Sequence, residues 1–496
     1  MFLLLHTAGF SQFVQSSQIE IPLSREDGQF EVIPAEKDGL FLYRRVFSND
    51  GEKLHLVKFD TAFAVNWEGF LPVNSRFELM GKRSFANKTY LLFRHREIAR
   101  KDLELVILEN GTGNFVKHNV RNFIPFIPSE FQVTSHGVII GGYFNNVPVV
   151  MFYSLSTRMT KVLPGIFNEP GELTQIQTSP TGEFEVLISA KNTLRAKTIW
   201  VKSYDTEGNL LYQIPLETDD KKHLLFARSI KTENGLHFVA GTYGTSRASE
   251  YSKGVFIARL DPDGMQQIRY YNYGDLQNFF KYMKVKREQR VKERIATRRV
   301  KGKKVRFNYR FLVHEIVPYN DQFVVLGEAF YAKYVTVERS MYGGFFNPIY
   351  RGMPVRNGRI FDGFYYTHAV VMGFDNNGKI LWDNSFEIND VKTYGLEQFV
   401  KLEMQPDRIA LLYLYDNKLR SKIIQGNEVL EGKTYHPLQK RGSLAFAKNE
   451  KNRSARLNYW YDDFFYAFGI REISNGVTSQ KVFFLSKINY DENSGE

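Results

Sequence analysis

Residues 366–390, YTHAVVMGFDNNGKILWDNSFEIND, decide how the rest of the chain is interpreted. Ala369–Phe374 is a continuous apolar run, which is typical of a buried strand. Asp375-Asn-Asn-Gly378 follows, and these residue types tolerate the positive φ angles of a tight turn. Beyond the turn, Ile380 and Trp382 begin a two-residue period, as on a half-buried strand. The stretch therefore predicts a β-hairpin.

The same hairpin pattern recurs along the chain. Its turns fall at positions 60, 110, 156, 205, 261, 375, 427 and 489, so most of them lie about 50 residues apart. Two further strand-like runs precede the hairpin, which makes four strands per repeat. A period of this length with several short strands is typical of propeller blades. The sequence predicts an all-β fold, a β-propeller of about eight four-stranded blades, with seven or nine blades as alternatives.

Both ends of the chain bear on this interpretation. The last repeat lacks a fourth strand and residues 17–24 can supply it, so residues 13–496 are expected to form one propeller closed by strand 17–24. Residues 1–12 are short, apolar and end in small or polar residues, like the tail of a secretory signal peptide. A buried N-terminal strand is the alternative. No run of 18 apolar residues follows, so no membrane-spanning helix is expected.

Motifs for catalysis and metal binding are not evident. Cysteine is absent from the 496 residues, which excludes disulfides, thiolate catalysis and cysteine-ligated metals. The ten histidines show no metal-site spacing, and no nucleophile turn or phosphate-binding loop is found. His368 is expected to be structural, and no catalytic residue, metal or cofactor is predicted. Paired carboxylates for glycoside hydrolysis remain open, because a propeller would bring them together from different blades.

One segment carries nearly all of the net charge. Lys281–Arg306 holds 13 Lys or Arg against Glu288 and Glu293, a net +11 in a chain of net +12. Residues 276–306 lack strand character and are expected to form a basic helical insertion. Such a surface suits nucleic acid, anionic lipid or an acidic protein, and export argues against nucleic acid. A solvated helix without a partner is the alternative. The candidate partner-binding residues are Lys284, Arg287, Arg290, Arg294, Arg298 and Arg299.

A second insertion, residues 330–365, is rich in Tyr, Phe, Gly and Arg. Tyr and Arg are enriched at the energetic centres of protein interfaces. Alternatively, the rings cover the propeller's own face or stack on sugars. Because successive loops of an up-and-down blade alternate between faces, both insertions are expected side by side on one face, opposite the Asp-x-x-Gly turns. The candidate partner-binding residues here are Tyr342, Phe345, Phe346, Tyr350 and Arg351.

Two passages resemble known propellers. Asp375-x-x-Gly378-x-x-x-Trp382 resembles the blade hairpins of quinoprotein-like propellers, but only in one repeat, so no quinone site is carried over. Gly9-Phe-Ser-Gln12, the cysteine-free propeller and Tyr366–Phe386 resemble exported propeller proteins of the Bacteroidota, among them the plug proteins of the type IX secretion translocon. This resemblance implies a non-enzymatic periplasmic protein at the outer membrane, which docks onto a barrel or its associated subunits. A carbohydrate-binding or carbohydrate-active propeller is the alternative function.

Overall fold

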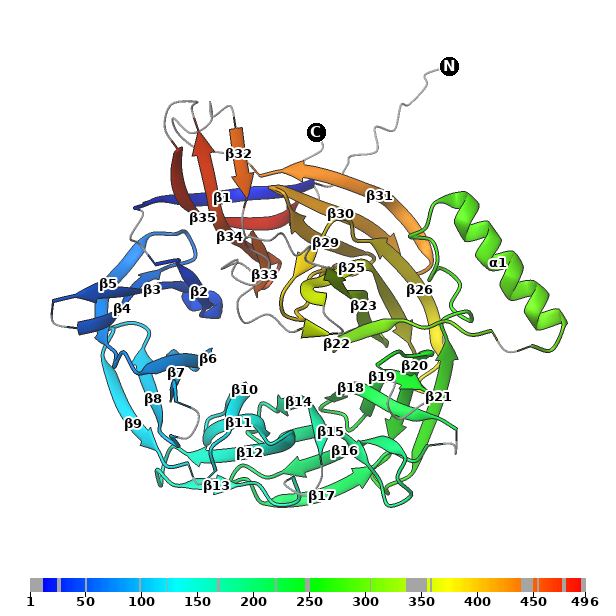
Figure 1. The fold of residues 1–496 in the computed structure, drawn as a ribbon, viewed down its shortest axis with the longest axis horizontal. Helices are drawn as coiled ribbons and strands as arrows, with labels where there is room; N and C mark the ends of the chain where they lie inside the picture. The colour runs from blue at the N-terminus through cyan, green and yellow to red at the C-terminus, as the bar shows by residue number, and fades with distance from the viewer. Residues whose placement is uncertain are drawn as a thin grey trace, which may run out of the picture.

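Eight antiparallel β-sheets stand around a central axis in the computed structural model of the chain (Figure 1). Each sheet is one blade with four main strands, which follow one another from the axis outward. This arrangement confirms the predicted β-propeller of eight four-stranded blades. The structure describes residues 12–24, 28–49, 51–97, 100–122, 124–166, 170–218, 221–245, 250–303, 305–335, 355–356, 359–438, 449–452, 455–474 and 479–491.

The first five blades follow one another along the sequence, and a 3-10 helix, Glu36–Asp38, joins the first two strands of blade one. From the axis outward, blade one consists of β2 (Glu31–Pro34), β3 (Leu40–Ser48), β4 (Gly51–Phe59) and β5 (Val65–Pro72), and blade two consists of β6 (Phe77–Phe85), β7 (Lys88–His95), β8 (Leu103–Glu109) and β9 (Phe115–Val120). Blade three consists of β10 (Ile127–Val133), β11 (Gly137–Phe144), β12 (Val147–Ser154) and β13 (Thr160–Val162), and blade four consists of β14 (Gly171–Thr178), β15 (Phe184–Lys191), β16 (Lys197–Tyr204) and β17 (Leu210–Pro215). Blade five consists of β18 (His223–Lys231), β19 (His237–Gly244), β20 (Gly254–Leu260) and β21 (Gln266–Asn272).

The last three blades carry the additional elements. An α-helix, α1 (Val285–Val300), lies between blades five and six. From the axis outward, blade six consists of β22 (Arg310–Tyr319), β23 (Gln322–Val335), β25 (Arg359–Phe374) and β26 (Ile380–Glu387). Blade seven consists of β28 (Lys401–Met404), β29 (Ile409–Tyr415), β30 (Lys418–Gln425) and β31 (Glu428–Pro437). Blade eight consists of β33 (Arg456–Tyr461), β34 (Phe464–Ser474), β35 (Ser479–Asp491) and β1 (Gln12–Leu23). The extra strands are β24 (Val355–Arg356) and β27 (Lys392–Thr393), which pair with β25, and β32 (Asn449–Asn452), which pairs with β34.

The first strand shares a sheet with the last. β1 runs antiparallel to β35 along its whole length and forms the outermost strand of blade eight. The fourth strand of this blade therefore comes from the other end of the chain and needs no hairpin. For this reason the turn predicted at Asn489 is wrong, and Asn489 lies inside β35. Residues 1–11 lie outside the described residues, so the signal peptide stays a prediction.

The repeated turn is built by the side chain of its aspartate. Oδ1 of Asp375 accepts hydrogen bonds from the backbone N–H groups of Asn377 (2.9 Å) and Lys379 (2.8 Å). Gly378 adopts a φ of +70°, in the left-handed region where a side chain is unfavourable. Asp205 accepts the same pair of bonds in blade four. The Asp-x-x-Gly pattern is thus turn chemistry that joins a third strand to a fourth.

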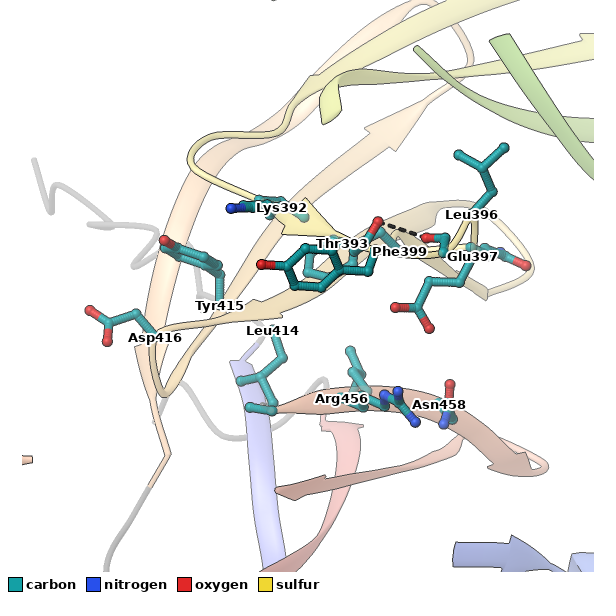
Figure 2. Close-up of a pocket in the computed structure, with 16 residues that line it drawn as sticks. Lys392, Thr393, Leu396, Glu397, Phe399, Leu414, Tyr415, Asp416, Arg456 and Asn458 are labelled. Carbon is teal, nitrogen blue, oxygen red and sulfur yellow. Dashed lines mark hydrogen bonds between the residues drawn. The ribbon is translucent and has the colours of Figure 1, made fainter. Parts of the chain in front are cut away.

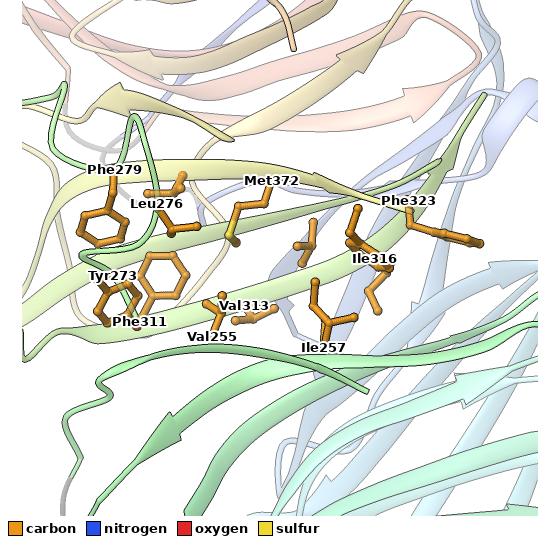
Figure 3. Close-up of a cluster of buried hydrophobic side chains, with 14 of the residues drawn as sticks. Val255, Ile257, Tyr273, Leu276, Phe279, Phe311, Val313, Ile316, Phe323 and Met372 are labelled. Carbon is orange, nitrogen blue, oxygen red and sulfur yellow. The ribbon is translucent and has the colours of Figure 1, made fainter. Parts of the chain in front are cut away.

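Apolar side chains fill the gaps between neighbouring blades. Trp382 lies in the core between blades six and seven, 9% exposed, and its Nε1 donates to Oε1 of Gln322 (2.8 Å). Between blades five and six, the core also includes side chains from the connection that follows β21. Figure 3 shows Tyr273, Leu276 and Phe279 of this connection packed among side chains of the two blades. The connection is therefore part of the propeller's interior.

A carboxyl group between blades seven and eight makes the stability of the ring sensitive to pH. Glu403 is 3% exposed, and burial, together with the charge and hydrogen bond of Asp463, raises its pKa from 4.5 to about 8. A raised folded-state pKa contributes stability that is complete below the ordinary value and is lost as the pH rises through the folded value. Glu403→Gln should therefore be more stable than the native chain at about pH 8.5, by up to about 4–5 kcal/mol.

Urea unfolding of both proteins at about pH 5 and about pH 8.5 measures this effect. The native chain should lose stability across the interval, whereas Glu403→Gln should lose much less. Asp407→Asn is a matched control, because Asp407 is an exposed carboxyl in the same blade. Equal pH dependence of the native chain and Glu403→Gln would show that another group is responsible.

Candidate interaction surface

The basic helix lies outside the ring. Figure 1 places α1 beyond the outer strands β26 and β31, not above the face of the propeller. The prediction that both insertions emerge side by side on one face is therefore wrong for the helix. The reason is that residues 276–284 are not helical: Leu276, Phe279 and Phe280 enter the core between blades five and six and fix where the helix begins. None of the helices among the described residues is long and apolar enough to cross a membrane.

Hydrogen bonds anchor the segment before the helix to blade six. The carboxylate of Asp383, on β26, accepts the backbone N–H groups of Gln277 (2.8 Å) and Asn278 (2.7 Å). The Asn278 side chain donates to the carbonyl oxygen of Asp383 (2.6 Å), and Ser385 Oγ donates to the carbonyl of Asn278 (2.8 Å). Burial raises the pKa of the Asp383 carboxyl, although these donors oppose the shift. The helix is therefore held to the propeller by a buried polar network.

The sequence of α1 explains its start, end and inward side. Its 16 residues contain no Gly or Pro, and it ends at Val300, two residues before Gly302, whose φ of +61° suits the residue that follows a helix terminus. Ile295 is buried, and Val291 is partly buried against the same core cluster. Lys292 pairs with Glu288 one turn earlier (2.6 Å). The apolar stripe thus faces the ring, and the remaining surface is polar apart from the exposed end residues Val285 and Val300.

The outward side of α1 is strongly basic. Seven of its residues are Lys or Arg, and two are Glu. Of the residues predicted from sequence, Arg287, Arg290 and Arg294 are exposed, as is Lys284 just before the helix. The remaining two differ: Arg298 is half-buried, and Arg299 donates to the carboxylate of Asp275 (2.7 Å) and to the carbonyl of Gly274 (2.9 Å). Arg299 therefore anchors the helix to the connection after β21 and also contributes to its positive charge.

The candidate aromatic residues Tyr342, Phe345, Phe346, Tyr350 and Arg351 lie outside the described residues. The structure describes the base of their insertion, where β23 and β25 run on together beyond the blade as far as the pair of Val335 and Ile360. β27 pairs with the same extension of β25. The insertion therefore begins as a long β-ribbon.

Exposed and half-buried rings and charges line this ribbon. The rings of Tyr331 and Tyr365 stack 5.6 Å apart, and the Lys333 ammonium lies 4.9 Å from the Tyr365 ring. Asp362 accepts from Lys392 (2.6 Å) and from the hydroxyl of Tyr365 (2.6 Å), and these bonds lower the pKa of its carboxyl. No sequence pattern indicated a role for Lys392, because this residue comes from the connection between blades six and seven. Tyrosine with lysine or arginine is a composition found at protein interfaces.

A cavity of about 620 Å³ lies beside the ribbon, between blades seven and eight. Figure 2 shows the connection that bears Lys392, Thr393 and Glu397 facing Arg456 and Asn458 of blade eight across it. The hydroxyl of Thr393 donates to the carbonyl of Gly395 (2.7 Å), which shapes the connection. No sequence motif pointed to this cavity, because its walls come from three distant segments.

A larger cavity, about 890 Å³, lies at the axis and is lined by the inner strands of blades three to six. It brings together charged residues that sequence reasoning did not single out, among them Glu130, Arg228 and Glu315. Within the parts of the chain that the structure describes, no cluster of three or more His, Asp or Glu side chains could hold a metal ion.

No protein-family model matches the chain, and no curated protein matches its sequence. Solved structures match in fold. The chain is similar to the polysaccharide lyase Uly1 (9% identity, TM-score 0.39, covering 96% of this chain and 99% of that one). It is also similar to the β-propeller domain of the Trilobed protease from Pyrococcus furiosus (9%, 0.38, 84% and 94%) and to the dihydro-heme d1 dehydrogenase NirN (10%, 0.42, 97% and 81%). Similarities this low concern the fold and say nothing about activity.

Proposed function

We propose that this protein is a non-enzymatic docking propeller, which uses the basic outer side of α1 to bind an acidic surface of a larger protein assembly. The observation that supports the proposal best is the placement of the charge. The basic residues stand on a helix anchored through Asn278 and Asp383 to blade six, outside the ring. A helix held in place loses little conformational freedom when a partner binds, which favours its use as a docking element.

Long-range electrostatic attraction allows a basic surface of this kind to select an acidic partner. Clustered like charges raise the rate at which an oppositely charged partner is met and select against partners of the same sign. The outward residues Arg287, Arg290 and Arg294 lie three and four positions apart, so they form a row along one side of the helix. Arginine in such a row can form paired hydrogen bonds with carboxylates. An acidic protein surface is therefore the partner that suits the helix best.

The sequence resemblance supports a proposal for where this protein is located and which protein assembly it serves. We infer a periplasmic protein at the outer membrane, whose partner is a barrel or an associated subunit, and which serves a protein-secretion translocon of type IX as a plug. The apolar start of the chain and the likeness of Tyr366–Phe386 to exported Bacteroidota propellers support this part of the proposal. The ribbon with Tyr331 and Tyr365 offers a second contact surface for the same partner.

Reversing three charges on α1 tests the docking role. The variant Arg287→Glu/Arg290→Glu/Arg294→Glu should bind its partner at least about tenfold more weakly, because each exposed pair contributes up to about 1 kcal/mol. Affinity of the native chain should also fall as salt is raised. Co-purification from detergent-solubilised envelopes identifies the partner, and titration of the purified pair measures the affinity.

The matched control reverses three exposed lysines elsewhere on the ring: Lys88→Glu, Lys191→Glu and Lys418→Glu. This control changes the net charge by the same amount, so it separates a local effect from a general one. It should bind the partner nearly as well as the native chain. Equal recovery of the partner with the native chain and the α1 variant would contradict the proposal.

Carbohydrate binding is the second candidate function, and the axial cavity is the observation that favours it. The cavity and α1 are different surfaces, so one role does not exclude the other.

A further inference from the structure

The axial cavity has the size and position of a binding site. Its volume of about 890 Å³ falls within the range of ligand pockets, about 300–1,000 Å³. Its walls come from β10, β14, β18 and β22, the innermost strands of four successive blades. The ribbon and residues 396–398 of the connection between blades six and seven complete the walls, together with Lys197 of β16, Thr242 of β19, Glu250 and Ser252. Because each strand belongs to a rigid blade, the lining side chains are held in fixed positions.

Acidic groups outnumber basic groups in the lining. The charged side chains are the carboxylates Glu130, Glu172, Glu250, Glu315 and Glu397 and the cations Lys197, Arg228 and Arg310. This excess of negative charge disfavours an anionic ligand. Each cation nevertheless has carboxylate partners nearby, so the wall offers donors and acceptors side by side rather than a field of one sign.

Arg228 is at the centre of this arrangement. Its Nη1 donates to the carbonyl of Thr174 (2.6 Å), which holds the guanidinium against the inner strand of blade four. The pKa of Arg228 lies below its ordinary value, because burial lowers it more than the charges of Glu130 and Glu315 raise it. Burial raises the pKa of Glu130, against the opposing effect of Arg228. Three blades thus bring an arginine within electrostatic range of two carboxyl groups.

Two other features complete the lining. Arg310, on β22 of blade six, forms an ion pair with Glu250, in the connection between β19 and β20 of blade five. Half-buried aromatic rings form part of the wall, and the rings of Phe330 and Phe364 meet edge to face at 5.6 Å. The half-buried rings in the lining are Phe226, Phe330, Tyr334 and Phe364.

We propose that the axial cavity binds a neutral saccharide. Sugar hydroxyls both donate and accept, so vicinal hydroxyls suit a wall that is lined by Arg228, Glu130 and Glu315 together. The C–H faces of a sugar ring suit aromatic side chains, and a neutral ligand is compatible with the acidic lining. A wholly apolar ligand would displace water from the charged groups of the lining without replacing its hydrogen bonds, which is costly. The inference rests on the cavity and is independent of docking through α1.

Titration calorimetry with the intact chain tests this inference. The probes are three neutral oligosaccharides of different linkage, maltohexaose, cellohexaose and xylohexaose, with hexalysine as the cationic probe and hexagalacturonate as the anionic probe. At least one neutral oligosaccharide should bind in the micromolar to millimolar range, and more tightly than either charged probe. Binding of hexalysine alone would overturn the inference in favour of a cationic peptide, and so would binding of hexagalacturonate alone in favour of an anionic ligand.

Substitutions locate the bound sugar. Glu130→Gln and Glu315→Gln should each weaken binding by about tenfold or more, because a hydrogen bond to a charged group is lost. Glu233→Gln, at an exposed turn of blade five, is the matched control and should leave the affinity unchanged. Unchanged affinity in both cavity variants would overturn the inference, as would the absence of binding by every neutral oligosaccharide. Circular dichroism melting of each variant confirms that a loss of binding is not a loss of fold.

Discussion

Glu328→Ala is expected to lower the free energy of unfolding by about 3–5 kcal/mol, because it removes the buried acceptor on which several donors converge. Glu328 is fully buried on β23. Its Oε1 accepts the backbone N–H of Val400 (2.6 Å) and its Oε2 the Nε2 of His314 (2.7 Å), while the N–H of Phe399 reaches both oxygens at 3.1 Å. An alanine would leave these donors buried without partners.

The loss should be concentrated in the connection between blades six and seven. Amide hydrogen exchange at Phe399 and Val400 should accelerate in Glu328→Ala, and urea unfolding should report the overall change. Glu328→Gln should be intermediate, since its amide oxygen can still accept one backbone N–H. Glu397→Ala is the matched control, because that side chain is exposed in the same connection. Normal protection of the Val400 amide in Glu328→Ala would contradict the role given to Glu328.

The propeller could be predicted from sequence because the residues that form each hairpin turn are close together in the chain. Each Asp-x-x-Gly turn is fixed by residues within five positions, as the bonds of Asp375 to its near neighbours show. The recurrence of such hairpins about every 50 residues then indicates the number of blades. The prediction of a turn at Asn489 was wrong for the opposite reason, because the contact that decides it is long-range. Its strand pairs with β1, almost the whole chain away, and no local pattern distinguishes a strand that continues from one that turns.

The placement of the helix depends on long-range contacts that composition does not contain. The charge of residues 281–306 is visible in the sequence, but the position of α1 depends on Asn278 meeting Asp383, 105 residues further on. The cavities follow the same rule. Arg228 and Glu130 come from different blades, and Lys392 joins the ribbon from a connection with no motif of its own. Sequence therefore identifies what kinds of residue are available, and the closed ring determines which of them meet.

Deleting Gln12–Leu23 is expected to prevent formation of a stable monomeric ring. β1 covers the outer edge of β35, whose residues Phe483, Phe484 and Leu485 are fully buried. Phe13 of β1 also packs its ring against Tyr490, at 5.2 Å. Without β1, a 13-residue strand would present an open edge, which pairs readily with other chains. Gel filtration should show oligomers, and a synthetic peptide of residues 12–23 should restore the monomer. A monomeric, cooperatively unfolding deletion variant would contradict this.

A disulfide across the same junction tests whether ring opening limits unfolding. Val14 lies opposite Asn489, a cross-strand spacing that a disulfide can bridge, and the native chain has no cysteine to compete. Oxidised Val14→Cys/Asn489→Cys closes most of the chain into one loop and should gain about 4–5 kcal/mol. Oxidised Val46→Cys/Lys53→Cys, inside the hairpin of β3 and β4, closes a short loop and should gain only about 2 kcal/mol. Urea unfolding measures both gains, and a gain of the first pair no larger than that of the second would contradict the expectation. An unfolding rate that is slowed only by the first disulfide would identify the junction of β1 and β35 as the place where unfolding begins.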